Sequence, residues 1–271
     1  MQILYFTSLA GLLIVYSPVF YFLYDAWNLD PYYSHGFIVP VVSIFLVWSS
    51  RKELMKSLAV ETDYPAIFVI IGILLYIVAI ILDFRFLMYL SFIVSLGGVI
   101  LFIWGSEVLK ILLFPLCYLL LMFPLPYSIT SAIAFPLQIF SSKSSVLLLN
   151  LLDISALQEG VNIHIPGFSF IIERGCSGLQ SIVALFTLAV LFAYLARGPI
   201  KKRIFLVFSS IPIALIANIL RITIVILVAK AWGREAAESF FHTFSSLFLF
   251  SMAFLLLTGT AKFIGCLPQK K

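Results

Sequence analysis

Long apolar runs, separated by short clusters of charged or turn-forming residues, are the dominant feature of this 271-residue sequence. An α-helix needs about 20 predominantly apolar residues to cross the hydrocarbon core of a bilayer, and many of the runs reach or approach this length. Apolar residues make up 63% of the chain, charged residues only 11%, and the mean hydropathy is +1.15. These values exclude a water-soluble domain and predict an all-α, polytopic integral membrane protein.

The apolar runs predict about eight transmembrane helices within a single integral-membrane domain that covers residues 1–271. The first run is too long and too weakly charged at its start for a cleaved signal peptide, so we expect it to remain as a helix. The expected spans are Ile3–Tyr24, Gly36–Trp48, Pro65–Leu82, Phe86–Trp104, Val108–Phe123, Leu179–Ala196, Ile204–Ala229 and Thr243–Phe263.

The distribution of Lys and Arg predicts the orientation of these spans. With eight spans both termini lie on one side, which carries eleven basic residues against five on the other, while Arg221 falls inside a span. Because basic loops are retained in the cytoplasm, we expect both termini to be cytoplasmic. The net charge of +5 does not indicate nucleic-acid binding, since the basic residues lie at helix ends and form no stripe with exposed aromatic residues.

Residues 128–172 form an ambiguous segment that is apolar enough for a ninth span. Lys143 within "SSKSS" argues against one, because a lysine at mid-membrane costs about 2.5–3.5 kcal/mol. We therefore expect an insertion on the outer surface, with one or two amphipathic helices. The following stretch "VNIHIPGFSFII" predicts a small β-hairpin around a Pro-Gly pair, with Val161, Ile163 and Ile165 on one face.

Basic residues at the inner ends of the helices allow the depth of polar residues to be estimated. Cys176 precedes Arg197 by 21 residues, or about 32 Å of helix, so Cys176 is expected at the outer face. Arg221 follows Arg203 by 18 residues, about 27 Å along a helix that runs the other way. The two residues are therefore predicted to lie at the same level.

His242 reaches this level as well, because it precedes Lys262 by 20 residues, about 30 Å of helix. A cysteine is nucleophilic as the thiolate, and its pKa falls beside a cation or at a helix N-terminus. Histidine can take up the thiol proton and return it to a leaving amine, while Arg221 can hold a substrate carbonyl or oxyanion. Cys176, His242 and Arg221 together suggest acyl transfer through a thioester.

Other polar residues near this level are supporting candidates. Ser177 is a plausible N-cap for the helix after Cys176, and Asn218, one turn before Arg221, either orients the arginine or bonds a neighbouring helix. His35 shapes a substrate cleft or packs at a helix start, and His164 lies on the polar face of the hairpin. No two histidines have the i, i+3 or i, i+4 spacing of metal ligands and there is no HExxH, so neither a metal nor another cofactor is expected.

Four other interpretations remain open from the residues alone. The cysteine can be a small packing residue, as we expect for Cys117 and Cys266. An intramembrane serine protease would use Ser177 as the nucleophile and His242 as the base. A transporter would place Arg221 and Asn218 in a solute path, and a component of polysaccharide export would need no catalytic residue at all.

Six short motifs, in this order along the chain, resemble the exosortase/archaeosortase family. They are "YYSHGFIVP", "FPLPY", "FPLQ", "CSGLQS", "ANILRIT" and "FFHTFS". The resemblance implies a bacterial inner-membrane transpeptidase with a Cys, Arg and His catalytic set, which corresponds to Cys176, Arg221 and His242. The acidic Glu173 lies three positions before the cysteine, one position earlier than in the family pattern.

The resemblance also implies the substrates and the side of the membrane. The expected partners are exported proteins that end in a short sorting signal of the PEP-CTERM type, a hydrophobic helix and a basic tail. Cleavage before that helix would take place on the periplasmic face. An amine or hydroxyl of a lipid or glycan carrier would then accept the exported protein, or water would hydrolyse the thioester, and the sequence does not choose between them.

Overall fold

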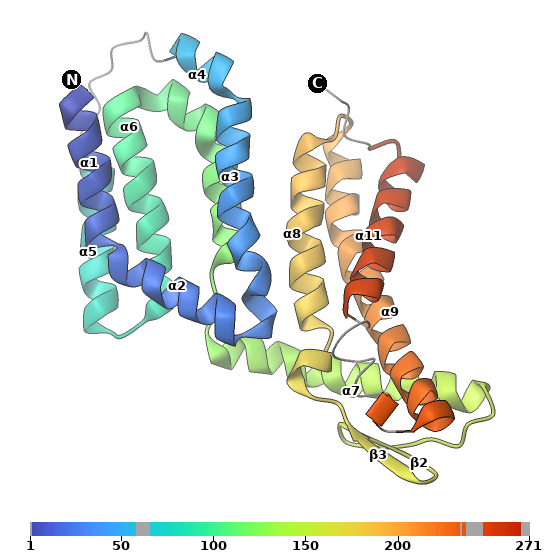
Figure 1. Cartoon of the computed structure of the whole chain (residues 1–271). Helices are drawn as coiled ribbons and strands as arrows, with labels where there is room; N and C mark the ends of the chain where they lie inside the picture. The colour runs from blue at the N-terminus through green and yellow to red at the C-terminus, as the bar shows by residue number, and fades with distance from the viewer. Residues whose placement is uncertain (1, 58–65, 234, 237–245, 267–271) are drawn as a thin grey trace. The chain divides into compact units, whose positions relative to one another are not determined.

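The computed structural model describes residues 2–57, 66–233, 235–236 and 246–266 of the 271-residue chain (Figure 1). The chain divides into two compact units, Met1–Pro126 and Tyr127–Lys271. Each unit is described by itself. The expected organisation as a single membrane domain stays a prediction.

The regular elements in the described part of the first unit are all helices. Its elements are α1 (Gln2–Val15), α2 (Ser17–Leu29), the 3₁₀-helix η1 (Pro31–Phe37), α3 (Ile38–Ser49), α4 (Arg51–Ser57), α5 (Ile67–Ile81), α6 (Arg85–Tyr118) and the 3₁₀-helix η2 (Leu119–Met122).

Two breaks distinguish these helices from the expected spans. The span expected over Ile3–Tyr24 is two helices, bent by 55° at Tyr16, because Pro18 has no backbone N–H with which to continue α1. Within α6, Gly105 has a φ of 81° and interrupts the helical geometry. Figure 1 shows α6 reversing direction around this break, where the sequence predicts the boundary between two spans.

A buried polar cluster joins three helices of the first unit. The Tyr16 hydroxyl lies 2.8 Å from Ser95 Oγ and donates to the Gly72 carbonyl at 3.3 Å. A Cβ on Gly72 would lie 2.1 Å from Ser95 Oγ, so only glycine permits this close approach of α5 and α6. Small residues therefore set the packing distance, as is common between membrane helices.

The second unit combines helices with a small sheet. Its elements are α7 (Tyr127–Leu151), β1 (Leu157–Glu159), β2 (Asn162–Ile165), β3 (Phe168–Ile171), the 3₁₀-helix η3 (Arg174–Cys176), α8 (Leu179–Leu195), α9 (Ile200–Trp232) and α11 (Ser246–Phe263). Figure 1 shows α8, α9 and α11 side by side, with α7 crosswise near the start of α8 and the second half of α9. Apolar residues of α8, α9 and α11 form one buried core.

The sheet has three antiparallel strands in the order β1-β2-β3. The hairpin of β2 and β3 was expected from the sequence, whereas β1 was not. Ile163 and Ile165 point into a buried cluster and Val161 is half-buried, so the predicted apolar face is confirmed. Segment 128–151 forms one helix, α7, rather than two.

The predicted number of spans is not confirmed. Among the described residues, four helices are long and apolar enough to cross a membrane, or five if the bent pair α1–α2 counts as one span. Three further apolar helical segments are shorter, namely α5, α8 and Phe250–Phe263 of α11. An all-α, multi-pass membrane protein with a small sheet is nevertheless what the structure shows.

Candidate active site

Cys176 ends the short helix η3 and lies three residues before the first residue of α8. Its side chain is 8% exposed and belongs to a buried cluster that includes Ile163 and Ile165 of the sheet. Gly178, the N-cap of α8, has a φ of 85°, which favours glycine. The cysteine is thus fixed at a sharp turn from the sheet into a helix.

Asn218 of α9 holds the backbone of this turn. Its Nδ2 donates to the Cys176 carbonyl at 2.8 Å and to Ser141 Oγ at 3.1 Å. The side chain is 2% exposed, and a Cβ on Gly178 would approach it to 3.1 Å. Asn218 therefore joins α7, α9 and the cysteine turn at one point. Of its two expected roles, the hydrogen bond to a neighbouring helix is the one that the structure shows.

Arg221, one turn further along α9, contacts the same turn. Its Nη2 donates to the Gly175 carbonyl at 3.1 Å, and its guanidinium also forms a hydrogen bond with the Cys176 thiol. The side chain is only 6% exposed. The structure thus brings together the thiol and the guanidinium that the sequence placed at one depth, although their catalytic roles stay a prediction.

The sequence reasoning missed the contribution of α7. Gln138 Nε2 donates to the Ile172 carbonyl at 3.0 Å, and Ser145 Oγ donates to the Ile219 carbonyl at 3.2 Å. Together with Ser141, these residues have the spacing i, i+3, i+7 and form one buried polar face of the helix. This spacing of polar residues in the sequence is a signal for such a face.

Burial raises the pKa of the Cys176 thiol above its ordinary value of 9.0. The positive charge of Arg221 and its hydrogen bond act in the opposite direction, and the negative charge of Glu173 adds to the rise. The sequence suggested a lowered pKa from a cation and a helix N-terminus. This expectation is wrong for the net shift, because removing the thiolate from water outweighs the attraction of the arginine.

The raised pKa predicts a specific pH dependence of Cys176 alkylation. A thiol with a raised pKa is protonated at neutral pH, so its reaction with iodoacetamide should increase with pH and reach its midpoint above pH 9.0. Arg221→Met removes a charge that lowers this pKa and should move the midpoint further up. Mass spectrometry of the Cys176 peptide measures this rate separately from Cys117 and Cys266. A midpoint at or below that of a free cysteine would contradict the prediction.

Glu173 and Ser177 flank the cysteine, but their contacts are local. The Glu173 carbonyl accepts the Cys176 N–H at 2.9 Å, and its side chain is exposed. Ser177 is fully buried, and its Oγ accepts the Leu179 N–H at 3.2 Å. The expectation that Ser177 is the N-cap of α8 is wrong, because the N-cap residue is Gly178, which has no side chain to cap the helix.

His35 and His242 differ in how the structure describes them. His35 lies in the first unit, where its Nε2 is 3.1 Å from the Leu121 carbonyl. His242 lies between residues 236 and 246, outside the part of the chain that the structure describes. Its predicted role as acid and base therefore stays a prediction.

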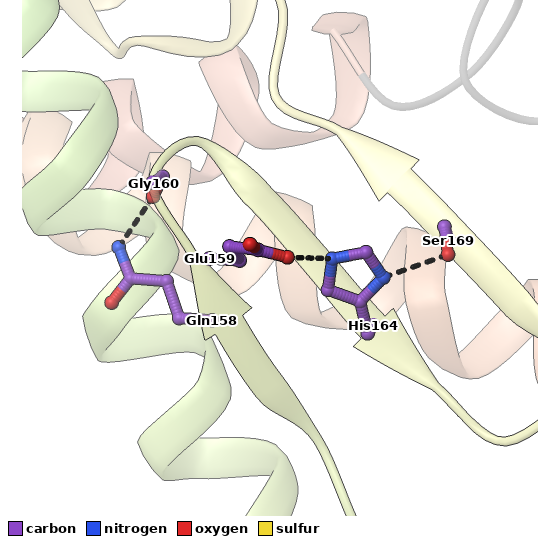
Figure 2. Close-up of polar contacts among 5 residues, drawn as sticks. All are labelled: Gln158, Glu159, Gly160, His164 and Ser169. Atoms are coloured by element: carbon purple, nitrogen blue, oxygen red, sulfur yellow. Dashed lines mark hydrogen bonds and ion pairs between the residues drawn. The ribbon is translucent and has the colours of Figure 1, made fainter.

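His164 lies on the polar face of the sheet, as the sequence predicts. Figure 2 shows its imidazole between two side chains, with Nδ1 2.8 Å from Ser169 Oγ and Nε2 3.4 Å from Glu159 Oε2. Because strand residues alternate between faces, His164 points away from the face through which Ile163 packs with Cys176. The imidazole stabilises the strand pairing and does not reach the thiol.

Comparison with known proteins identifies the family. A family model described as transmembrane exosortase (Exosortase_EpsH) matches residues 27–259, a range that contains Cys176, Asn218, Arg221 and His242. Neither curated proteins nor solved structures gave a match. Since the match covers most of the 271 residues, the chain belongs to the transmembrane exosortase family, whose members are membrane-embedded peptidases or transpeptidases that act on exported proteins with sorting signals.

Proposed function

We propose that this exosortase is a thiol-dependent transpeptidase that cleaves the C-terminal sorting signal of exported proteins through a thioester on Cys176. The observation that carries the proposal is the convergence of the Arg221 guanidinium and the Asn218 amide on the turn that holds the thiol. A buried arginine inside an apolar helix is costly, and such residues are functional by default.

The first half of the reaction forms the thioester. His242 takes the proton from the Cys176 thiol as the sulfur attacks the carbonyl carbon of the scissile peptide bond. Arg221 donates hydrogen bonds to the oxyanion that develops, and His242 then protonates the leaving amine. The C–N bond breaks, and the apolar helix with its basic tail is released.

The raised pKa of Cys176 supports a base that acts during the attack. A thiol that is protonated at neutral pH needs a partner to accept its proton when the substrate arrives. A stable thiolate in the resting protein would instead require a lowered pKa. We therefore assign His242 the role of general base rather than that of a permanent imidazolium partner.

The second half of the reaction transfers the exported protein. An amine or hydroxyl of a lipid or glycan attacks the thioester, its proton passes to His242, and the thiol is restored. Attack by water would make the protein a protease. We further propose that the insertion over 128–172 lies on the outer face of the plasma membrane, with both termini cytoplasmic. The crosswise course of α7 relative to α8 and α9 supports a position along the surface, although α7 is itself one of the four helices long and apolar enough to cross a membrane.

The mature C-terminus of a substrate tests this proposal. We expect mass spectrometry of an exported protein that ends in a sorting signal, an apolar helix and a basic tail to show truncation before the helix. Transfer predicts an added acceptor mass on the new C-terminal carbonyl, and hydrolysis predicts a free carboxylate. Deletion of the gene should leave the protein at full length. A full-length product in the presence of the active gene would contradict the proposal.

A further inference from the structure

The two edges of the small sheet differ in what covers them. The β1 edge faces α7, because Gln158 Nε2 donates to the Ile139 carbonyl at 3.2 Å, and it carries the charged Glu159. On the other edge, no residue in the described ranges forms a backbone hydrogen bond to the outer side of β3. Within the described chain, β3 is thus the open edge.

The strand register shows which backbone groups point outward from β3. The Ile172 N–H donates to the Val161 carbonyl at 3.0 Å, so this opposed pair is hydrogen-bonded. Opposed residues of an antiparallel pair alternate, so Phe170 faces β2 as well, while Ser169 and Ile171 direct their N–H and C=O groups away from it. The open edge therefore offers two donors and two acceptors to an additional strand.

The composition of β3 also favours pairing. Proteins usually protect an exposed edge with charged residues, proline or a bulge. The strand Phe168–Ile171 contains none of these, and the Ile171 side chain is 70% exposed. An uncharged open edge is the structure to which extended peptides add by main-chain hydrogen bonding.

The strand β3, which forms the open edge, is followed closely in the chain by Cys176. Phe168, Phe170 and Ile172 pack with the buried cluster that contains Cys176, and Gln138 fixes the Ile172 carbonyl. Figure 1 shows the chain passing from β3 into the turn at the start of α8. A peptide aligned along β3, about 13 Å for four residues, is therefore held beside the turn that presents the thiol.

We propose that the sorting segment of the substrate binds as an added β-strand along β3, with its main chain bonded to Ser169 and Ile171, which directs the scissile bond to Cys176. This inference rests on the proposed peptidase function. A helical substrate satisfies its own backbone groups and shields its carbonyls, so the segment before the apolar helix must be extended to be cleaved. The main-chain bonds supply affinity, and alternate side chains of the segment supply specificity.

Proline at position 171 tests the pairing in the full-length enzyme. Ile171→Pro removes an outward N–H without breaking a bond to β2, and the preceding residue is already extended, as proline requires. Ile171→Ala changes the same side chain but keeps the N–H. We expect Ile171→Pro to lower kcat/KM about tenfold more than Ile171→Ala, mainly through a higher KM. Equal effects of the two substitutions would overturn the inference.

Hydrogen–deuterium exchange provides a readout that does not depend on cleavage. The probe is a synthetic peptide of a sorting signal followed by its apolar helix and basic tail, added to full-length Cys176→Ala protein in lipid nanodiscs. The peptide should slow exchange of the Ser169 and Ile171 amides at least about tenfold and leave the Phe170 amide unchanged.

The exchange results also separate this inference from the proposed function. Failure of the peptide to bind, or binding without protection of the two amides, overturns the added strand. Protection that appears without peptide and increases with protein concentration assigns the edge to a second copy, and also overturns it. Protection of the amides in a wild-type protein that cleaves no substrate would uphold the binding site and refute the peptidase.

Discussion

Replacement of Cys176 by alanine is expected to lower kcat/KM for cleavage of a sorting-signal substrate by at least about 10³-fold. The thiol is the only group proposed to bond the substrate covalently, and neither Arg221 nor Asn218 can replace a nucleophile. The variant should fold, because the substitution removes only a sulfur atom. The hydrogen bond from Asn218 goes to the backbone carbonyl of residue 176, which the variant keeps. Cleavage can be measured by mass spectrometry of the peptide products in nanodiscs.

Ser177→Ala is the matched control for the nucleophile. The hydroxyl of Ser177 accepts the Leu179 N–H, and loss of one such hydrogen bond costs about 1 kcal/mol, so we expect a loss of activity within about tenfold. Retained activity in Cys176→Ala together with a complete loss in Ser177→Ala would refute the thiol mechanism. That result would identify the protein as a serine protease.

Arg221→Met is expected to lower kcat by about 10²- to 10³-fold, the cost of removing one oxyanion donor. Methionine fills a similar volume in the apolar surroundings but donates no hydrogen bond to the thiol, to the Gly175 carbonyl or to a substrate. Arg221→Lys keeps the charge without the planar set of donors and should recover only part of the loss.

Lys230→Met serves as the charge-matched control for Arg221. Lys230 is exposed in the last turn of the same helix and should retain activity after the substitution. Folding of both variants can be compared by thermal unfolding in the same detergent. Wild-type activity in a folded Arg221→Met protein would remove the arginine from the mechanism.

The common depth of Cys176 and Arg221 could be anticipated because a membrane helix has a fixed rise per residue. Counting from basic residues at the inner ends placed both side chains at one level, and the structure brings them into contact. Alternation around the Pro-Gly pair likewise gave the hairpin and its buried face. These features depend on local geometry, which the order of residues along the chain determines.

Features that depend on lateral contact could not be obtained in this way. The bond between Asn218 and Ser141 joins residues 77 positions apart, and no period in the sequence identifies such a partner. The strand β1 has only three residues and is stabilised by its neighbours rather than by its own composition. The bend at Tyr16 was overlooked because hydropathy averages over a window and does not register Pro18.

The crosswise helix α7 has a mechanical consequence. Three hydrogen bonds couple one face of this helix to the strand end before the nucleophile and to α9: Gln138 and Ser145 donate to backbone carbonyls, and Ser141 accepts from Asn218. Its opposite face exposes Leu147 and Leu151. Because α7 is hydrogen-bonded along one face and apolar along the other, a tilt of this helix would move the backbone groups bonded to it. The orientation of α7 and the direction of the Cys176 thiol are therefore mechanically coupled.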